Sequence, residues 1–185
     1  MSVISSIVYH IYRLPLMTVF VLMGIAVLVW AILAVTLRKK YRKSWKAVNT
    51  VFLLLLVYSI LYITLLRRKP NPDNLMVLTP FASLEAAKQQ GEIYRELTMN
   101  ILLFFPVGLF LPQLLPDRWK TWQKILVTAA AGLLFSAGME TVQFLTALGD
   151  AETDDILTNV LGTAFGALHV LLAGGIYRLL KKKCF

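Results

Sequence analysis

Glu140 is the side chain best placed to do chemistry, because it is the one carboxylate in the apolar run from Ile125 to Leu148. An ionisable residue inside a membrane helix costs about 2.5–3.5 kcal/mol on insertion scales, so it needs a partner or a function. Ser136 and Gln143, at positions i−4 and i+3, lie on the same face of the expected helix. If the protein is a membrane enzyme, Glu140 is the expected general acid or base, with neighbouring polar groups orienting the substrate.

Carboxylates and amides also mark the starts of two other apolar runs. Glu96 and Asn100 stand at the start of one run, and Asp155 and Asn159 at the start of the other. These helix ends are expected at one side of the membrane, so their polar groups reach a similar depth. The candidate catalytic residues are Glu140, Asp154 and Asp155, and the candidate substrate-binding residues are Glu96, Asn100, Ser136, Gln143 and Asn159.

Each of these residues also has a purely structural interpretation. Asp154 and Asp155 would be stabilised by the dipole of a helix N-terminus. Glu140 could be a hydrogen-bonded contact between helices. The same three carboxylates could also hold a hard cation such as Mg²⁺ or Ca²⁺, but no ligand-spacing motif requires one, so no metal site is assigned. The residues identify no cofactor.

The elements that position these residues are predicted to be membrane helices. The 185-residue chain is 58% hydrophobic and 16% charged, which is too apolar for an ordinary soluble domain. Five apolar runs are long enough to cross a bilayer, which needs roughly 20 residues. We therefore expect an all-α polytopic helix bundle, with spans at Leu14 to Leu37, Ala47 to Leu66, Leu97 to Leu115, Ile125 to Leu148 and Ile156 to Leu180.

The distribution of Lys and Arg predicts the orientation of the bundle. Thirteen of the 19 cations lie in one set of loops and six in the other, and cytoplasmic loops are the basic ones. The N-terminus is therefore expected outside and the C-terminus in the cytoplasm. The run from Arg67 to Lys69 is an exception, because it puts three cations on the outer side. The expected segments are an interfacial segment 1–13, a first hairpin 14–66, an outer loop 67–96, a three-helix core 97–180 and a basic tail 181–185.

Smaller signals refine this organisation. Ser83, followed by Glu85, predicts the capped start of a short helix in the outer loop. Pro106 is expected to kink the third span. Gly162 and Gly166 form a small-xxx-small pair that lets another helix approach closely. Cys184 is the single cysteine, so an intramolecular disulfide framework is excluded. The net charge of +9 lies in short clusters that punctuate the apolar runs, which speaks against nucleic-acid binding.

Two segments between Glu96 and Gly166 resemble the VanZ-like family, named for a teicoplanin-resistance membrane protein. The first is similar to the family block N-x-L-x-F-x-P-x-G, and the second to S-x-x-x-E-x-x-Q followed by D-D-x-x-x-N-x-x-G-x-x-x-G. The matching residues are Asn100, Leu102, Phe104, Pro106 and Gly108, and then Ser136, Glu140, Gln143, Asp154, Asp155, Asn159, Gly162 and Gly166. The resemblance implies a multi-pass protein of the bacterial cytoplasmic membrane, linked to low-level glycopeptide resistance that leaves the peptidoglycan terminus unchanged.

The sequence departs from the family pattern at one position. Family members carry an arginine ahead of the paired aspartates, in a run of the type R-x-x-D-x-D-D, whereas this chain has Gly149 to Asp155 without one. A guanidinium is the natural bidentate partner of a carboxylate or phosphate. Either Arg95 or Arg67 supplies that charge from the outer loop, or part of the site is lost.

Three functions are compatible with these residues. The resemblance favours a resistance factor that alters how lipoglycopeptides such as teicoplanin reach or dwell on the outer membrane surface. A second alternative is a membrane enzyme with a carboxylate and amide site, acting on a lipid-linked envelope substrate. A third is a small transporter or lipid flippase, although no inverted repeat is evident. The expected partners are membrane lipids, with a lipid-linked cell-wall precursor or a lipoglycopeptide as specific ligand.

Overall fold

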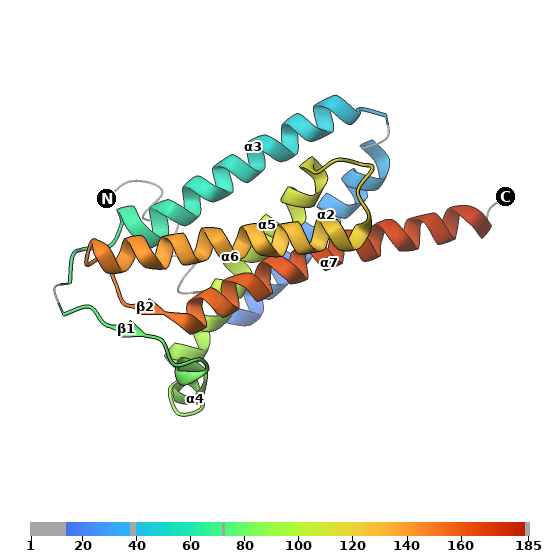
Figure 1. Ribbon diagram of the computed structural model, residues 1–185. Coiled ribbons are helices and arrows are strands. Elements are labelled where there is room, and N and C mark those ends of the chain that lie inside the picture. Colours follow the sequence, from blue (N-terminus) through green and yellow to red (C-terminus); the bar gives the residue numbers. More distant parts are fainter. Residues whose placement is uncertain (1–13, 38–39, 72, 184–185) are drawn as a thin grey trace.

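The computed structural model describes the backbone of residues 14–37, 40–71 and 73–183, and their side chains except at residues 35 and 171–183. The expected interfacial segment 1–13 and residues 184–185 of the basic tail lie outside this part of the chain. The described residues form long helices that are joined by short connections, except for a longer segment between η1 and α5 (Figure 1). The prediction of an all-α membrane helix bundle is confirmed.

The helices agree with the apolar runs but begin and end at slightly different residues. A single π-helical turn, η1, extends α3, and two short strands pair in parallel near one end of the bundle. The elements in chain order are α2 (Leu16–Leu37), α3 (Arg42–Leu61), η1 (Tyr62–Leu66), β1 (Met76–Val77), α4 (Ala82–Ala87), α5 (Gly91–Leu114), α6 (Thr121–Leu145), β2 (Ala151–Glu152) and α7 (Thr153–Lys183).

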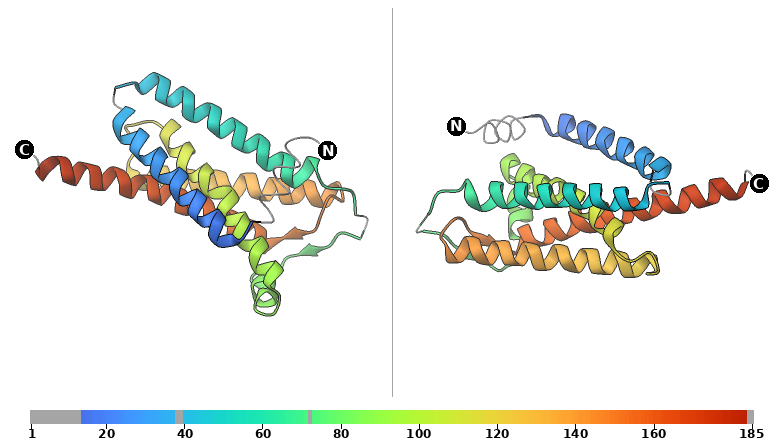
Figure 2. Two further views of the ribbon diagram at one scale, coloured as in Figure 1. Left: turned by 180° about the vertical axis from the view of Figure 1, so that it is seen from behind. Right: turned by 90° about the horizontal axis from the view of Figure 1, so that it is seen from above.

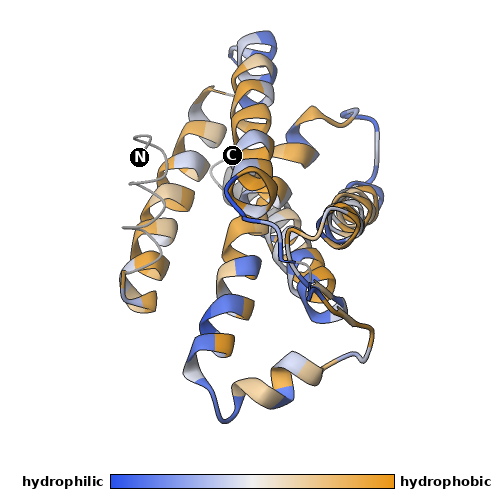
Figure 3. Cartoon of the chain, turned by 90° about the vertical axis from the view of Figure 1, so that its left-hand side faces the viewer, coloured by the Kyte–Doolittle hydropathy of each residue, from blue (hydrophilic) through white to orange (hydrophobic). Residues whose placement is uncertain are grey.

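Among the described residues, four helices are long and apolar enough to cross a membrane: Leu16–Ala34, Arg42–Leu66, Gly91–Leu114 and Thr121–Leu145. The expected fifth span falls within the 31-residue helix α7 and stays a prediction. Hydrophobic residues predominate along the helices, and hydrophilic ones gather toward helix ends and on connecting segments (Figure 3). On α2 most large apolar side chains are exposed. Such a surface suits lipid better than water.

Helices α5 and α7 form the most extensive helix contact in the bundle. Glycines make it possible: a Cβ at Gly166 would collide with the carbonyl oxygen of Phe105, and one at Gly162 with that of Ile101. Helices α2 and α6 lie on opposite sides of this pair (Figure 2). The close approach predicted from Gly162 and Gly166 is therefore present. Helix α5 continues through Pro106, and the expected kink there stays a prediction.

The segment after η1 folds back across one end of the bundle (Figure 1). Its strand β1 pairs with β2 just before α7, and α4 packs on α5. Helix α5 begins at Gly91, so the expected outer loop 67–96 contains the first turn of that helix. The ends of the long helices fall into two sets, as a multi-pass arrangement requires. Which set faces the cytoplasm stays a prediction from the cation distribution.

Candidate functional site

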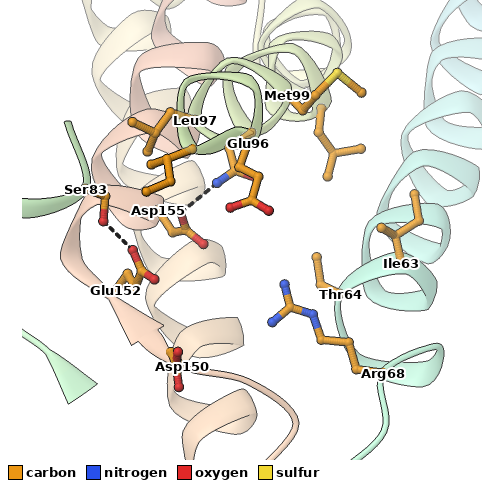
Figure 4. Close-up of a pocket in the computed structure, with 13 residues that line it drawn as sticks. Ile63, Thr64, Arg68, Ser83, Glu96, Leu97, Met99, Asp150, Glu152 and Asp155 are labelled. Carbon is orange, nitrogen blue, oxygen red and sulfur yellow. Dashed lines mark hydrogen bonds between the residues drawn. The ribbon is translucent and has the colours of Figure 1, made fainter. Parts of the chain in front are cut away.

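A cavity of about 530 Å³ opens where the end of α3, the start of α5 and the segment before α7 meet (Figure 4). Ligand pockets of small molecules commonly have 300–1,000 Å³. Its wall combines four carboxylates and one guanidinium with apolar and hydroxyl groups. The charged residues that line it are Arg68, Glu96, Asp150, Glu152 and Asp155.

The carboxylates on the α7 side of the cavity are held in place by hydrogen bonds. Asn100 donates from Nδ2 to Oδ1 of Asp155 over 2.8 Å. The hydroxyl of Ser83 donates to Oε2 of Glu152 over 2.5 Å, and both contacts appear as dashed lines in Figure 4. The backbone N–H of Leu75 donates to Oδ1 of Asp150 over 2.7 Å. Among the described residues, each of these side chains has one carboxylate oxygen in a hydrogen bond, so its second oxygen can bind a ligand.

Arg68 supplies the cation of the cavity. It follows η1, and Figure 4 shows its side chain directed from that side toward the carboxylates. The arginine expected from the family pattern would stand at Gly149, and a Cβ built at Gly149 would overlap Nη1 of Arg68. The Arg68 side chain therefore passes directly over the position from which that arginine would extend.

The structure corrects the expected source of this charge. Arg67 and Arg95 were the candidates, but neither lines the cavity. Arg95 is turned away, and its Nη2 donates to the carbonyl oxygen of Leu14 over 2.7 Å. Sequence reasoning missed Arg68 because it read residues 67–69 as a topology signal. One signal in the sequence could have identified Arg68: the predicted topology places these three cations on the outer side of the membrane, where Lys and Arg are rare.

The π-helical turn η1 forms part of the cavity wall. Its residues Ile63 and Thr64 line the cavity, and π-helical turns are frequent at functional sites. Gln143 Nε2 donates to the carbonyl oxygen of Thr64 over 3.0 Å. This bond ties α6 to η1, because Thr64 lies in the last turn of the helix, where backbone carbonyls have no partner within the helix. Gln143 therefore supports the wall from behind and does not line the cavity.

Glu140 lies behind the cavity lining as well. Its side chain is buried, and Oε2 accepts the backbone N–H of Glu152 over 3.2 Å. This contact joins α6 to β2, the strand that carries Glu152 into the cavity. Deeper in the bundle, Asn159 Nδ2 donates to Oγ of Ser136 over 2.9 Å. The two buried polar groups form a link between α6 and α7.

Asp154 is engaged with the outer segment. Its carboxylate accepts the backbone N–H groups of Phe81 at 2.6 Å and Ser83 at 2.8 Å, so it caps α4 from across the fold. The expectation that Ser83 caps this helix was wrong, because Ser83 lies within α4 and its hydroxyl bonds Glu152. Phe81, which precedes the helix, has a left-handed backbone with φ of 66°. The carboxylate of Asp154 stabilises this turn by binding its N–H groups.

The predicted site residues therefore fall into two groups. Glu96, Asn100 and Asp155 line the cavity, whereas the other five lie behind or beside it, namely Ser136, Glu140, Gln143, Asp154 and Asn159. The structural residues Gly108, Gly162 and Gly166 lie at the contact of α5 with α7. In the part of the chain that the structure describes, no group of three His, Cys, Asp or Glu side chains is arranged to hold a metal ion.

Comparison with known proteins identifies one family. The family model described as VanZ/LLP1 matches residues 18–174, which is most of the chain. No curated protein and no solved structure matches the chain. The match extends well beyond the two segments that carried the resemblance, and it includes Arg68 and the whole cavity lining.

Proposed function

We propose that this chain, which belongs to the VanZ/LLP1 family, lowers the susceptibility of bacteria to lipoglycopeptides such as teicoplanin. The protein is a multi-pass membrane protein. It would act at the outer surface of the bacterial cytoplasmic membrane, where it alters the access or the dwell time of the antibiotic.

The observation that carries this proposal is the charged cavity at one end of an apolar bundle. With the orientation that the cation distribution predicts, this end faces outward. There the cavity meets both the membrane surface and molecules that arrive from outside. Its carboxylates and guanidinium can bind polar groups, while Ile93 and Leu97 of α5 contribute apolar surface. A molecule with a polar part and an acyl chain suits such a lining.

The test is the teicoplanin susceptibility of a sensitive Gram-positive host that expresses the wild-type chain or Arg68→Gln, with membrane abundance matched by immunoblot. We expect the wild type to protect and Arg68→Gln to lose most of that protection, because the cavity loses its guanidinium. Arg67→Gln is the matched control, since Arg67 is exposed and does not line the cavity. It should protect like the wild type.

A second variant tests the position of the guanidinium. In the Arg68→Gln background, Gly149→Arg places a guanidinium at the family position, in space that the wild-type Arg68 side chain occupies. The backbone of Gly149 does not have a positive φ, so an arginine is accommodated there. We expect this double variant to regain protection. Lack of protection by the wild-type chain itself would refute the proposed function.

A second candidate function is a membrane enzyme that acts on a lipid-linked envelope substrate. The hydrogen-bonded pair of Asn100 and Asp155 in the cavity favours it, because a carboxylate held by an amide can serve as a general base. An enzyme would change the envelope lipids of the expressing host, and Asp155→Asn would abolish that change. Identical lipid profiles in the wild-type and Asp155→Asn strains would exclude this alternative.

A further inference from the structure

The cavity carries both signs of charge, and this combination narrows the class of ligand. Four carboxylates face one guanidinium, so an anion alone would meet strong repulsion from the acidic wall. A cation alone would be attracted by the carboxylates but would leave the guanidinium of Arg68 without an anionic ligand. In the described part of the chain Arg68 donates no side-chain hydrogen bond, so its planar group is available to an anionic oxygen. The wall therefore suits a molecule that carries an ammonium and an acidic group together.

The two kinds of charge lie on different sides of the cavity. Arg68 comes from the η1 side, whereas Glu152 and Asp155 come from the segment at the start of α7 (Figure 4). Glu96 stands on α5 between them, and no hydrogen bond of its carboxylate is present among the described residues. An acidic group on Arg68 therefore places an attached ammonium within reach of the carboxylates.

Most of the remaining lining is apolar, and part of it lies further along α5 toward the middle of the bundle. Along α5 the lining includes Ile93, Leu97 and Leu103. Leu103 lies about 10 Å further along the helix than Glu96, at 1.5 Å per residue. Ile63 of η1 adds to the same wall. An acyl chain attached to the polar group would find apolar contacts in this direction, because Leu103 packs against the hydrophobic core of the bundle.

From these three features we propose that the cavity binds the zwitterionic headgroup of an acyl-bearing amphiphile, with its acidic group on Arg68 and its ammonium on Glu96 and the carboxylates of the α7 side. The inference rests on the proposed function, because it assigns a ligand class to the same cavity. A membrane aminophospholipid and a lipoglycopeptide both have this chemistry. Binding of such headgroups is a direct way to alter how an acylated antibiotic dwells at the membrane surface.

The test is calorimetric titration of the purified full-length protein in detergent with dioctanoyl phosphatidylethanolamine and dioctanoyl phosphatidylglycerol. The two lipids share chains and phosphate, and only the first has an ammonium. We expect the first to bind at least about tenfold more tightly, the size of one charge-assisted hydrogen bond. Glu96→Gln should remove most of this preference. The matched control Glu92→Gln lies one turn earlier on α5, does not line the cavity and should keep the preference.

Equal affinity for the two lipids, or equal loss in Glu96→Gln and Glu92→Gln, would overturn the proposal. Thermal unfolding of each variant shows whether a loss of binding reflects loss of the fold. Arg68→Lys is a second test variant. It keeps the positive charge, so it should retain the preference for the ammonium lipid while binding both lipids more weakly. Free phosphoethanolamine and teicoplanin serve as competitors, and the one that displaces the lipid identifies the source of the headgroup.

The outcome of the lipid titration is independent of the outcome of the susceptibility test. Protection of cells without any ammonium preference in the purified protein overturns the ligand class and leaves the resistance function standing. An ammonium preference without protection supports the ligand class and refutes the resistance function.

Discussion

Polar residues in this bundle have two separate roles. Those that line the cavity keep an oxygen or a donor available, as Asp155 does beside Asn100. Those behind it use their polar atoms to join elements, as Glu140 does by accepting the backbone N–H of Glu152. A carboxylate inside a membrane helix was a strong functional signal in the sequence. In the structure, the carboxylate of Glu140 binds the backbone of Glu152, and the side chain of Glu152 lines the cavity.

This role predicts the effect of changes at Glu140 on stability. Glu140→Gln keeps an acceptor oxygen for the N–H of Glu152, so we expect its free energy of unfolding to lie within about 1 kcal/mol of the wild type. Glu140→Leu leaves that N–H without its partner and should cost about 1–3 kcal/mol. Unfolding in mixed detergent micelles measures both values. Equal stability of the two variants would show that the hydrogen bond contributes nothing.

At the scale of the elements, the site depends on two connections that cross the fold. The first is the α4 turn, where Asp154 binds the N–H groups of Phe81 and Ser83 and thereby brings the Ser83 hydroxyl to Glu152. The second is the contact of α5 with α7, which sets the distance between the helix that carries Glu96 and Asn100 and the helix that carries Asp155. Both connections must form before the cavity has its charged wall.

The helix contact predicts opposite effects for two glycine substitutions. A Cβ at Gly166 would collide with the backbone oxygen of Phe105, so Gly166→Ala should cost about 1–3 kcal/mol of unfolding free energy. Gly138 in α6 has nothing within 4 Å of such a Cβ. Gly138→Ala should therefore be neutral or stabilise by up to about 1 kcal/mol through helix propensity. A Gly166→Ala protein as stable as Gly138→Ala would contradict the tight packing of α5 on α7.

At the scale of the whole molecule, position relative to the membrane decides what the cavity can meet. The cavity lies at the end of the bundle that holds α4, β1 and β2 (Figure 1). At the opposite end Arg42 forms an ion pair with Asp117, which joins the start of α3 to the connection between α5 and α6. The basic residues concentrate at this opposite end, so the cavity end is expected outside.

Cysteine labelling tests this orientation. In a Cys184→Ser background, Lys88→Cys places a thiol just after α4, and Lys43→Cys places one in the first turn of α3, both at exposed positions. We expect a membrane-impermeant maleimide to label position 88 in intact cells and position 43 only after permeabilisation. The reverse pattern would place the cavity on the cytoplasmic side and remove the basis for action at the outer surface.

The sequence alone determined the membrane helices, the family and the polar residues at the helix ends, because apolar length and local spacing are properties of contiguous residues. Only the tertiary structure decided which polar groups share a cavity. The reason is that these contacts join distant parts of the chain, as Leu75 and Asp150 do. In the tertiary structure Arg68 lies over Gly149. Glu140 and Asp154 do not line the cavity, because their carboxylates bind backbone N–H groups of β2 and of the outer segment packed against α7.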